Sequence, residues 1–263
     1  MGGGVMEGWS AAALAGLFGL ALGSFLNVCA LRWSQDGSVL RPRSHCPSCG
    51  TTVVWYDNVP VVSWIVLRGR CRRCGGGISF HYPAVELATG LGWAGLVLLH
   101  GPSAEALRGA LFLTLLLGIT VADARFYIIP DQFSVGGAVL GLVMAPLTPA
   151  LQLFDAAVGA ATGFGVLWAV ATLGRWAFKK EAMGGGDIKM MAMVGAFLGP
   201  SGVFLTIFLG ALLGTVVFGP ISYRTGKLVP FGIFLAAGAA VTYGWGDALL
   251  SWYWEWAMGP PSP

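Results

Sequence analysis

Charged residues are scarce in this sequence. Asp, Glu, Lys and Arg make up only 10% of its 263 residues, whereas 56% are hydrophobic. A soluble domain carries about 25% charged residues, because its surface must face water. This chain has too few charges to cover a soluble surface, so most of its surface must face lipid. Its net charge of +3 is also too small to indicate a nucleic-acid partner, and we expect none.

Long apolar runs, in contrast, fill most of the chain. A helix that spans a bilayer needs roughly 20 mainly apolar residues. Eight runs approach this length: 9–31, 83–99, 104–122, 132–147, 153–174, 187–199, 201–220 and 231–254. They predict an all-α polytopic membrane protein with about eight transmembrane helices. The sixth run is short, so a kink at Gly199-Pro200 within one long span is an alternative.

The positions of the basic residues favour eight spans. Lys and Arg are retained on the cytoplasmic side of a membrane protein. With eight spans and the N-terminus outside, the cytoplasmic loops hold 14 of the 15 Lys and Arg, and only Arg108 is outside. Fusing the sixth and seventh spans would move Arg224 and Lys227 to the wrong side. We therefore expect eight spans.

The first run is expected to be a retained helix rather than a signal peptide. Residues 1–8 contain Glu7 and no Lys or Arg, whereas a secretory signal starts basic. The run also contains Asn27 and leads directly into Arg32. Residues 1–31 are thus predicted to form the first transmembrane helix.

Four of the five cysteines lie in residues 32–82, the only long polar segment. They form two C-x-x-C-G pairs: Cys46 with Cys49, and Cys71 with Cys74. Two residues between thiols let one tight turn aim both sulfurs at one ion, and the following glycine can take a positive φ. Four thiolates match a tetrahedral structural zinc site. Two disulfides are the alternative, which the reducing cytoplasm disfavours.

A loop of this size cannot bury much core, so the metal is expected to supply its fold. Residues 32–82 are therefore predicted to be a small zinc-stapled subdomain on the cytoplasmic face. His45 and His81 are not needed as ligands beside four thiols. Cys29, within an apolar helix, is interpreted as a small packing residue.

Two aspartates are placed where membrane spans end. A carboxylate at the centre of a span costs roughly 2.5–3.5 kcal/mol, so such residues tend to be functional. Asp123 ends the third run, and Asp187 starts the sixth directly after Gly184, Gly185 and Gly186. On the predicted topology both are at the cytoplasmic edge, where the two helix ends can meet. Two carboxylates that share a site hold one proton between them, as the pair of an aspartic protease does.

The neighbouring residues have simpler alternatives. Gly184–Gly186 would let an extended substrate approach the backbone beside Asp187. Equally, this run can be a flexible loop with Asp187 as the helix N-cap. Helix capping explains Asp131. Glu86 is expected to pair with Arg32 or with an arginine of the loop.

Short motifs also follow one another in a specific order and spacing. They are Gly23-Ser-Phe-Leu-Asn-Val28, Arg43-Ser-His-Cys-Pro-Ser-Cys-Gly50, Trp55-Tyr-Asp-Asn-Val-Pro60, Tyr82-Pro-Ala-Val-Glu-Leu87, Ile129-Pro-Asp131, Gly184-Gly-Gly-Asp187-Ile-Lys189 and Pro230-Phe-Gly232. This set resembles the type 4 prepilin peptidase family over nearly the whole chain. Two positions depart from the usual family pattern: Gly185 replaces a larger residue, and Ile233 stands where a second proline is common. Neither is expected to touch a catalytic atom.

The resemblance implies a function and roles for particular residues. Asp187 would be the aspartate of the G-x-G-D motif and Asp123 its catalytic partner, in a protease core at 83–263. The family is found in the bacterial inner membrane. It removes the basic leader from prepilins and pseudopilins on the cytoplasmic side, and many members then methylate the new N-terminus with S-adenosylmethionine. Polar residues flanking the loop are the candidates for binding that cofactor: Asn27, Arg32 and Glu86.

Functions of other classes are alternatives. Ionisable residues in a protein with eight spans also suit a proton-coupled transporter. However, the acids cluster at one membrane edge, and no inverted repeat is visible in the sequence. A third reading is an inactive zinc-bearing scaffold.

Overall fold

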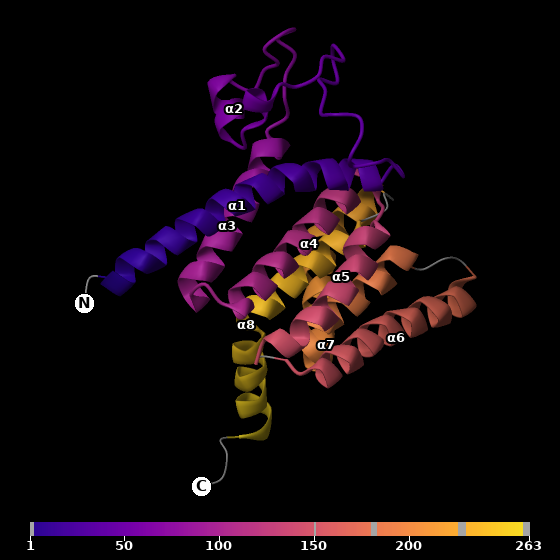
Figure 1. Ribbon diagram of the computed structural model, residues 1–263. Coiled ribbons are helices and arrows are strands. Elements are labelled where there is room, and N and C mark those ends of the chain that lie inside the picture. The colour runs from indigo at the N-terminus through magenta and orange to yellow at the C-terminus, as the bar shows by residue number, and fades with distance from the viewer. Residues whose placement is uncertain (1–2, 150, 180–182, 226–229, 260–263) are drawn as a thin grey trace. The chain divides into compact units, whose positions relative to one another are not determined.

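The computed structural model describes residues 3–149, 151–179, 183–225 and 230–259. Over these ranges the chain forms eight α-helices and two short 3-10 helices, without a β-strand (Figure 1). The all-α prediction is confirmed. The helices pack into two compact units, residues 1–122 and residues 123–263. The functional division expected at residues 31 and 82 stays a prediction.

Within the described part of the chain, six helices are long and apolar enough to cross a membrane. They are α1 (Gly3–Trp33), α3 (His81–His100), α4 (Ala104–Phe126), α6 (Leu153–Phe178), α7 (Gly185–Thr225) and α8 (Phe231–Met258). The run at 132–147 instead forms the shorter α5 (Asp131–Met144) and a 3-10 turn, η2 (Ala145–Leu147). A polytopic membrane protein is thus confirmed, but a count of eight full spans is not. Lys180 and Lys227, two of the basic residues expected in cytoplasmic loops, lie outside the described residues.

In the first unit, α1 packs antiparallel against α3 through small residues. A Cβ added to Gly23 would lie 2.7 Å from the Cα of Glu86, and one on Gly19 would lie 2.9 Å from the carbonyl oxygen of Thr89. Small residues let membrane helices approach this closely. The Asn27 amide adds a hydrogen bond of 3.2 Å to the carbonyl oxygen of Tyr82, where α3 begins. The ends of α1 and α3 are thereby fixed together below the polar segment that connects them.

That connecting segment has little regular structure, as Figure 1 shows. It contains only the 3-10 turn η1 (Trp55–Asn58) and the short helix α2 (Val62–Val66). The indole N–H of Trp64 on α2 donates a hydrogen bond of 3.0 Å to the carbonyl oxygen of Ile78. A few such bonds and the cysteine cluster described below replace a hydrophobic core here.

In the second unit, α6 packs antiparallel on the first half of α7. A Cβ on Gly163 would lie 2.0 Å from the carbonyl oxygen of Met191, and one on Gly195 would lie 2.0 Å from that of Gly159. Neither position has room for even a methyl group. Backbone contact, rather than interlocking large side chains, therefore sets the distance between these helices.

Helix α7 folds back on itself at Gly199. This residue has non-helical dihedrals, φ 70° and ψ −178°, and Pro200 follows it. Gly186 contacts Ile129, which also contacts Gly232 at the start of α8, while Gly214 packs on Phe234, two residues further along α8. In a straight helix, Gly186 and Gly214 would be about 42 Å apart. The runs 187–199 and 201–220 are therefore two antiparallel arms, which explains why both appeared as separate apolar runs.

Candidate active site and metal centre

Asp123 lies in the last turn of α4, with only 6% of its surface exposed. Helix α4 ends directly after it: the Tyr127 N–H bonds the Asp123 carbonyl oxygen at 3.0 Å, and Tyr127 takes a positive φ of 56°. The chain then passes through Ile129 to Pro130, the N-cap of α5. The tight end of α4 thus leaves the Asp123 carboxyl buried at the edge of the second unit.

The start of α8 covers the Asp123 carboxyl. The backbone N–H of Ile233 donates a hydrogen bond of 3.1 Å to Oδ2 of Asp123. A Cβ on Gly232 would lie 2.8 Å from the same oxygen and 2.9 Å from Cδ1 of Ile129, so only glycine fits there. The expectation that Ile233 touches no candidate catalytic atom is therefore wrong. The motif Pro230-Phe-Gly232 was visible in the sequence, but nothing in its spacing showed which side chain it would cover.

Asp187 lies in the first turn of α7 and is half-buried. Its carboxyl is close enough to that of Asp123 for the two charges to interact. Ile129 helps to bring them together, since it contacts Gly186 before Asp187 and Gly232 above Asp123. Two carboxyls that are 64 positions apart in the sequence are thereby brought together at one end of the second unit.

The three glycines before Asp187 differ in what surrounds them. A Cβ on Gly186 would press on Ile129 at 2.9 Å, so this glycine is needed for packing. A Cβ on Gly184 would lie 3.4 Å from Oδ2 of Asp187, and one on Gly185 would meet no described atom within 4 Å. Gly184 and Gly185 are exposed. Substrate approach along them stays a prediction, and the surroundings leave room for it.

Asp131 has a different partner. The Lys189 ammonium contacts both of its carboxylate oxygens at 2.8 Å, and both side chains are largely exposed. This ion pair joins the first turn of α5 to the first turn of α7. Asp131 is thus engaged at the surface, whereas Asp123 is buried and Asp187 is half-buried.

The four cysteines of the connecting segment are brought together as predicted. The sulfur atoms of Cys46, Cys49, Cys71 and Cys74 all lie within 4.8 Å of one another, and those of Cys46 and Cys74 are 3.8 Å apart. A tetrahedral zinc ion with bonds of about 2.3 Å holds its thiolates about 3.8 Å apart. The cluster therefore has the size that a metal ion of this kind requires. All five cysteines are free thiols, which contradicts the alternative of two disulfides.

The two cysteine turns repeat one local structure, 25 residues apart. In the first, the Cys46 N–H bonds the Thr51 carbonyl oxygen and the Gly50 N–H bonds that of Cys46. In the second, the N–H groups of Cys71 and Gly75 make the equivalent bonds to Gly76 and Cys71. Gly50 and Gly75 take φ of 69° and 71°, as the turn needs. The repeat supports a built site with ligands from both turns.

Two of the four thiols, those of Cys49 and Cys71, are shifted toward the thiolate, the form that binds a metal, whereas hydrogen bonds with the neighbouring cysteines raise the pKa of the Cys74 thiol to about 11. Hydrogen bonds from the side chain and backbone of Thr51 lower the pKa of the Cys49 thiol to about 6. Hydrogen bonds from the backbone of Cys74 and Arg73 lower the pKa of Cys71. Since the thiolate and not the thiol is the ligand, both shifts prepare the site for a cation.

The three residues expected to bind a cofactor have distinct surroundings. Glu86 is buried, and its Oε2 accepts the backbone N–H of Val61 at 2.7 Å, rather than pairing with an arginine. Val61 has a positive φ of 61°, which costs a β-branched residue of order 1–3 kcal/mol, and this bond helps to hold it. The Asn27 amide bonds the carbonyl oxygens of Gly23 and Tyr82. Glu86 and Asn27 thus have structural contacts, while Arg32 borders a cavity.

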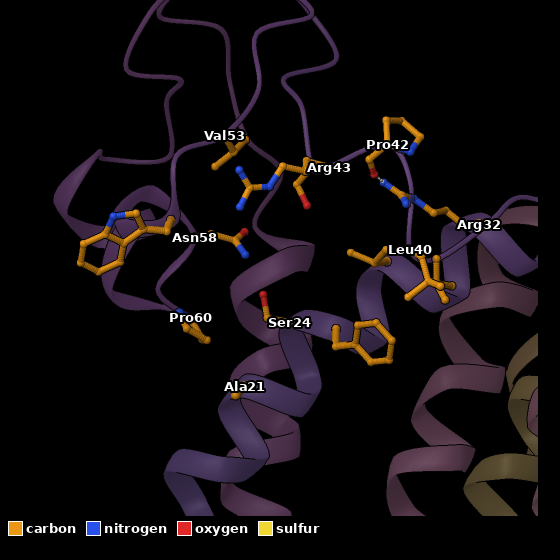
Figure 2. Close-up of a pocket in the computed structure, with 14 residues that line it drawn as sticks. Ala21, Ser24, Arg32, Leu40, Pro42, Arg43, Val53, Asn58 and Pro60 are labelled. Atoms are coloured by element: carbon orange, nitrogen blue, oxygen red, sulfur yellow. Dashed lines mark hydrogen bonds between the residues drawn. The ribbon is translucent and has the colours of Figure 1, made fainter.

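This cavity, of about 430 Å³, lies between the end of α1 and the connecting segment (Figure 2). The Arg32 guanidinium donates hydrogen bonds to the carbonyl oxygens of Ser38 and Pro42 and so holds one wall. Figure 2 shows the side chains of Arg43 and Asn58 pointing into the space above Ser24. Arg43 and Asn58 do not stand out in the sequence as binding residues, because they share no spacing with other candidate residues.

Comparison with known families gives two matches. Residues 17–100 match the model described as Bacterial Peptidase A24 N-terminal domain. Residues 110–219 match the model described as Type IV leader peptidase family. The cysteine turns and the cavity fall in the first match. Asp123 and Asp187 both fall in the second.

Several curated proteins with the name prepilin leader peptidase/N-methyltransferase are similar to this chain. The protein from Myxococcus xanthus is 38% identical over 216 residues, which are 81% of this chain and 64% of that protein. The protein from Aeromonas hydrophila is 33% identical, over 93% of this chain and 94% of its own length. The protein from Bacillus subtilis is 33% identical, over 92% and 98%. No solved structure matches the chain.

Proposed function

The chain belongs to the type IV leader peptidase family, and we propose that it is a membrane-embedded aspartyl endopeptidase with a second, methyl-transferring activity. Its substrates would be prepilins or pseudopilins, from which it removes the basic leader. The relatives' names combine these two activities. The observation that carries the peptidase function is the pair formed by Asp123, which is buried against the first turn of α8, and the half-buried Asp187.

In the proposed peptidase reaction the two carboxyls hold one proton between them. The ionised carboxyl takes a proton from a water molecule, whose oxygen attacks the scissile carbonyl carbon. The protonated carboxyl donates a hydrogen bond to the carbonyl oxygen as negative charge develops there. A proton then passes to the leaving amine, the C–N bond breaks, and the mature N-terminus is released.

Other residues of the second unit position this pair. The Ile233 N–H holds Oδ2 of Asp123, and the absence of a side chain at Gly232 lets the α8 backbone reach that oxygen. Gly184 and Gly185 leave the backbone beside Asp187 uncovered, so the extended leader junction can approach the carboxyls there. Extended substrate beside a fixed carboxyl pair is the geometry that hydrolysis requires.

We assign the site to the cytoplasmic side of the bacterial inner membrane. The distribution of Lys and Arg supports this, since Arg125 follows Asp123 and Lys189 follows Asp187 within two residues of each. The substrate would dock its apolar helix among the membrane spans and leave its basic leader in the cytoplasm. The connecting segment with the cysteines would be on the same side.

Zinc is the ion we propose for the four cysteines. Four thiolates at tetrahedral separation suit zinc, and the repeated turns supply them without a further ligand. Four protein thiolates would fill the coordination of a zinc ion, so the metal would hold the fold of the segment rather than take part in chemistry. S-adenosylmethionine is the proposed methyl donor, which supplies an electrophilic methyl group to the new N-terminal amine.

The purified chain, incubated with a model prepilin and S-adenosylmethionine, tests this function. The proposal predicts a shortened product that carries one added methyl group, seen by intact-mass spectrometry. A shortened product without the methyl group would support the peptidase activity and contradict the methyltransferase activity. An uncut substrate would contradict the peptidase and favour an inactive zinc-bearing scaffold.

A further inference from the structure

The cavity beside α1 is built by two parts of the first unit. Helix α1 contributes one side, including Ala21, Ser24 and Val28, and the connecting segment contributes the rest. Its volume of about 430 Å³ falls within the range of about 300–1,000 Å³ that is usual for small-molecule sites. The cavity is thus large enough for a nucleoside-sized ligand but small for a folded partner.

One cation in this cavity is free to bind a ligand. Among the residues that the structure describes, the Arg43 guanidinium has no hydrogen-bond or ion-pair partner, and Figure 2 shows it pointing into the cavity. Arg32, by contrast, is held by the carbonyl oxygens of Ser38 and Pro42. A planar guanidinium with all its donors available suits a carboxylate, which it can bind with two parallel hydrogen bonds.

An aromatic surface lies beside this cation. Trp55 lines the cavity and is 78% exposed, and its ring makes an edge contact with Tyr56. The turn that carries it is anchored by Asp57, which makes an ion pair of 2.6 Å with Arg72. An uncovered indole on an anchored turn provides a stacking platform for a purine base.

The cysteine cluster fixes the remaining wall. The N–H of Val53 bonds the carbonyl oxygen of Ser44 at 2.8 Å, and both residues line the cavity while flanking the first cysteine turn. The first cysteine turn therefore links the part of the wall that carries Arg43 to the part that carries Trp55. Backbone hydrogen bonds, rather than loose packing, hold this wall.

We propose that this cavity binds S-adenosylmethionine, with its carboxylate on Arg43 and its adenine on Trp55. The inference rests on the proposed methyltransferase function and locates its cofactor in the first unit. Asn58, which points into the same space, is placed to hydrogen-bond either end of the ligand. Of the three residues expected from sequence, only Arg32 borders this site, and it does so by shaping the wall. An anionic phospholipid headgroup shares the affinity for Arg43 but offers nothing to stack on Trp55.

Binding of S-adenosylmethionine to the full chain in detergent, measured by isothermal titration calorimetry, tests this location. Arg43→Gln and Trp55→Ala are each expected to weaken binding at least about tenfold, as loss of a charged hydrogen bond or a stacked base does. Arg41→Gln is the matched control, because Arg41 is an exposed arginine that does not line the cavity. Zinc content shows that each variant keeps its fold, and Trp55→Phe should retain binding if stacking is the role of Trp55.

The outcomes separate this inference from the function on which it rests. If the unaltered chain binds and transfers the methyl group while Arg43→Gln and Trp55→Ala bind as tightly, the cavity is not the site and the function stands. If the unaltered chain neither binds S-adenosylmethionine nor methylates the substrate, the proposed methyltransferase function and the location of its cofactor are both contradicted. If Arg43→Gln reduces retention on vesicles of anionic phospholipid without changing cofactor affinity, the cavity is a headgroup site and the inference is overturned.

Discussion

The backbone N–H of Ile233 and the carboxyl of Asp123 are joined by a hydrogen bond of 3.1 Å. The bond ties the first turn of α8 to the last turn of α4, and Gly232 makes it sterically available. A buried carboxylate needs such donors, because no bulk water replaces them. The start of α8 therefore acts as a positioning element for a residue on another helix.

Gly232→Ala tests this positioning. The new Cβ would lie 2.8 Å from Oδ2 of Asp123, so either the carboxyl or α8 must shift. A misplacement of about 1 Å near the chemistry can lower a rate about 100-fold, and we expect a fall in kcat of that order. Gly244→Ala, in the same helix but with no described atom within 4 Å of its Cβ, should cleave at the normal rate. Equal rates for the two variants would contradict the positioning role.

Asp131→Asn should leave cleavage within a few-fold of normal. Its carboxylate is paired with Lys189 at the surface, where an exposed ion pair contributes about 0–1 kcal/mol to stability. We expect a small decrease in the free energy of unfolding that disappears in high salt, because salt screens exposed pairs. Complete loss of cleavage in this variant, with the fold intact, would place Asp131 in the catalytic pair instead.

Removal of one cysteine ligand should release the metal. We expect zinc in the purified chain by elemental analysis and its loss in Cys49→Ser, with increased proteolysis of residues 34–80 because little core holds them. Cys29→Ala is the matched control, since Cys29 is buried in α1 away from the cluster. Normal zinc content in Cys49→Ser, or no zinc in the unaltered chain, would argue against the structural metal.

A pair of glycines in α6 tests the close packing of the second unit. A Cβ on Gly163 would lie 2.0 Å from the Met191 carbonyl oxygen, whereas one on Gly165 would meet nothing within 4 Å. Overpacking of this kind typically costs about 1–3 kcal/mol, so Gly163→Ala should lower the thermal midpoint. Gly165→Ala should leave it unchanged or raise it, because alanine favours the helix. Equal midpoints would show that α6 and α7 are not in backbone contact.

Much of this fold follows from the composition and apolar runs of the sequence. The all-α class and the four clustered cysteines were predictable, because lipid exposure and metal geometry each impose a simple pattern. The count of spans was not, since hydropathy cannot show that 132–147 would stop at a short helix. The break at Gly199 was visible in the sequence, but only contacts of Gly186 and Gly214 with the region around α8 show that the chain reverses there.

The sequence likewise indicated the candidate carboxyl pair but not the residues that surround it. Asp123 and Asp187 stood out because carboxylates are rare at membrane spans. Their contacts with Gly232, Ile233 and Ile129 depend on which helix ends meet, and this is set by packing between segments far apart in the sequence. The partner of Glu86 was not predictable. An arginine was expected, but the Glu86 carboxylate accepts the backbone N–H of Val61, while its role in cofactor binding stays a prediction.

The most direct test of the account is the cleavage of a purified model prepilin by the unaltered chain, Asp123→Asn and Asp187→Asn, with methylation of a pre-cleaved substrate followed in parallel. The substitutions keep the shape of each side chain but remove the shared proton and charge. The account predicts that both variants lose cleavage and still methylate the pre-cleaved substrate. Persistent cleavage by either variant would contradict the assignment of Asp123 and Asp187 as the catalytic pair.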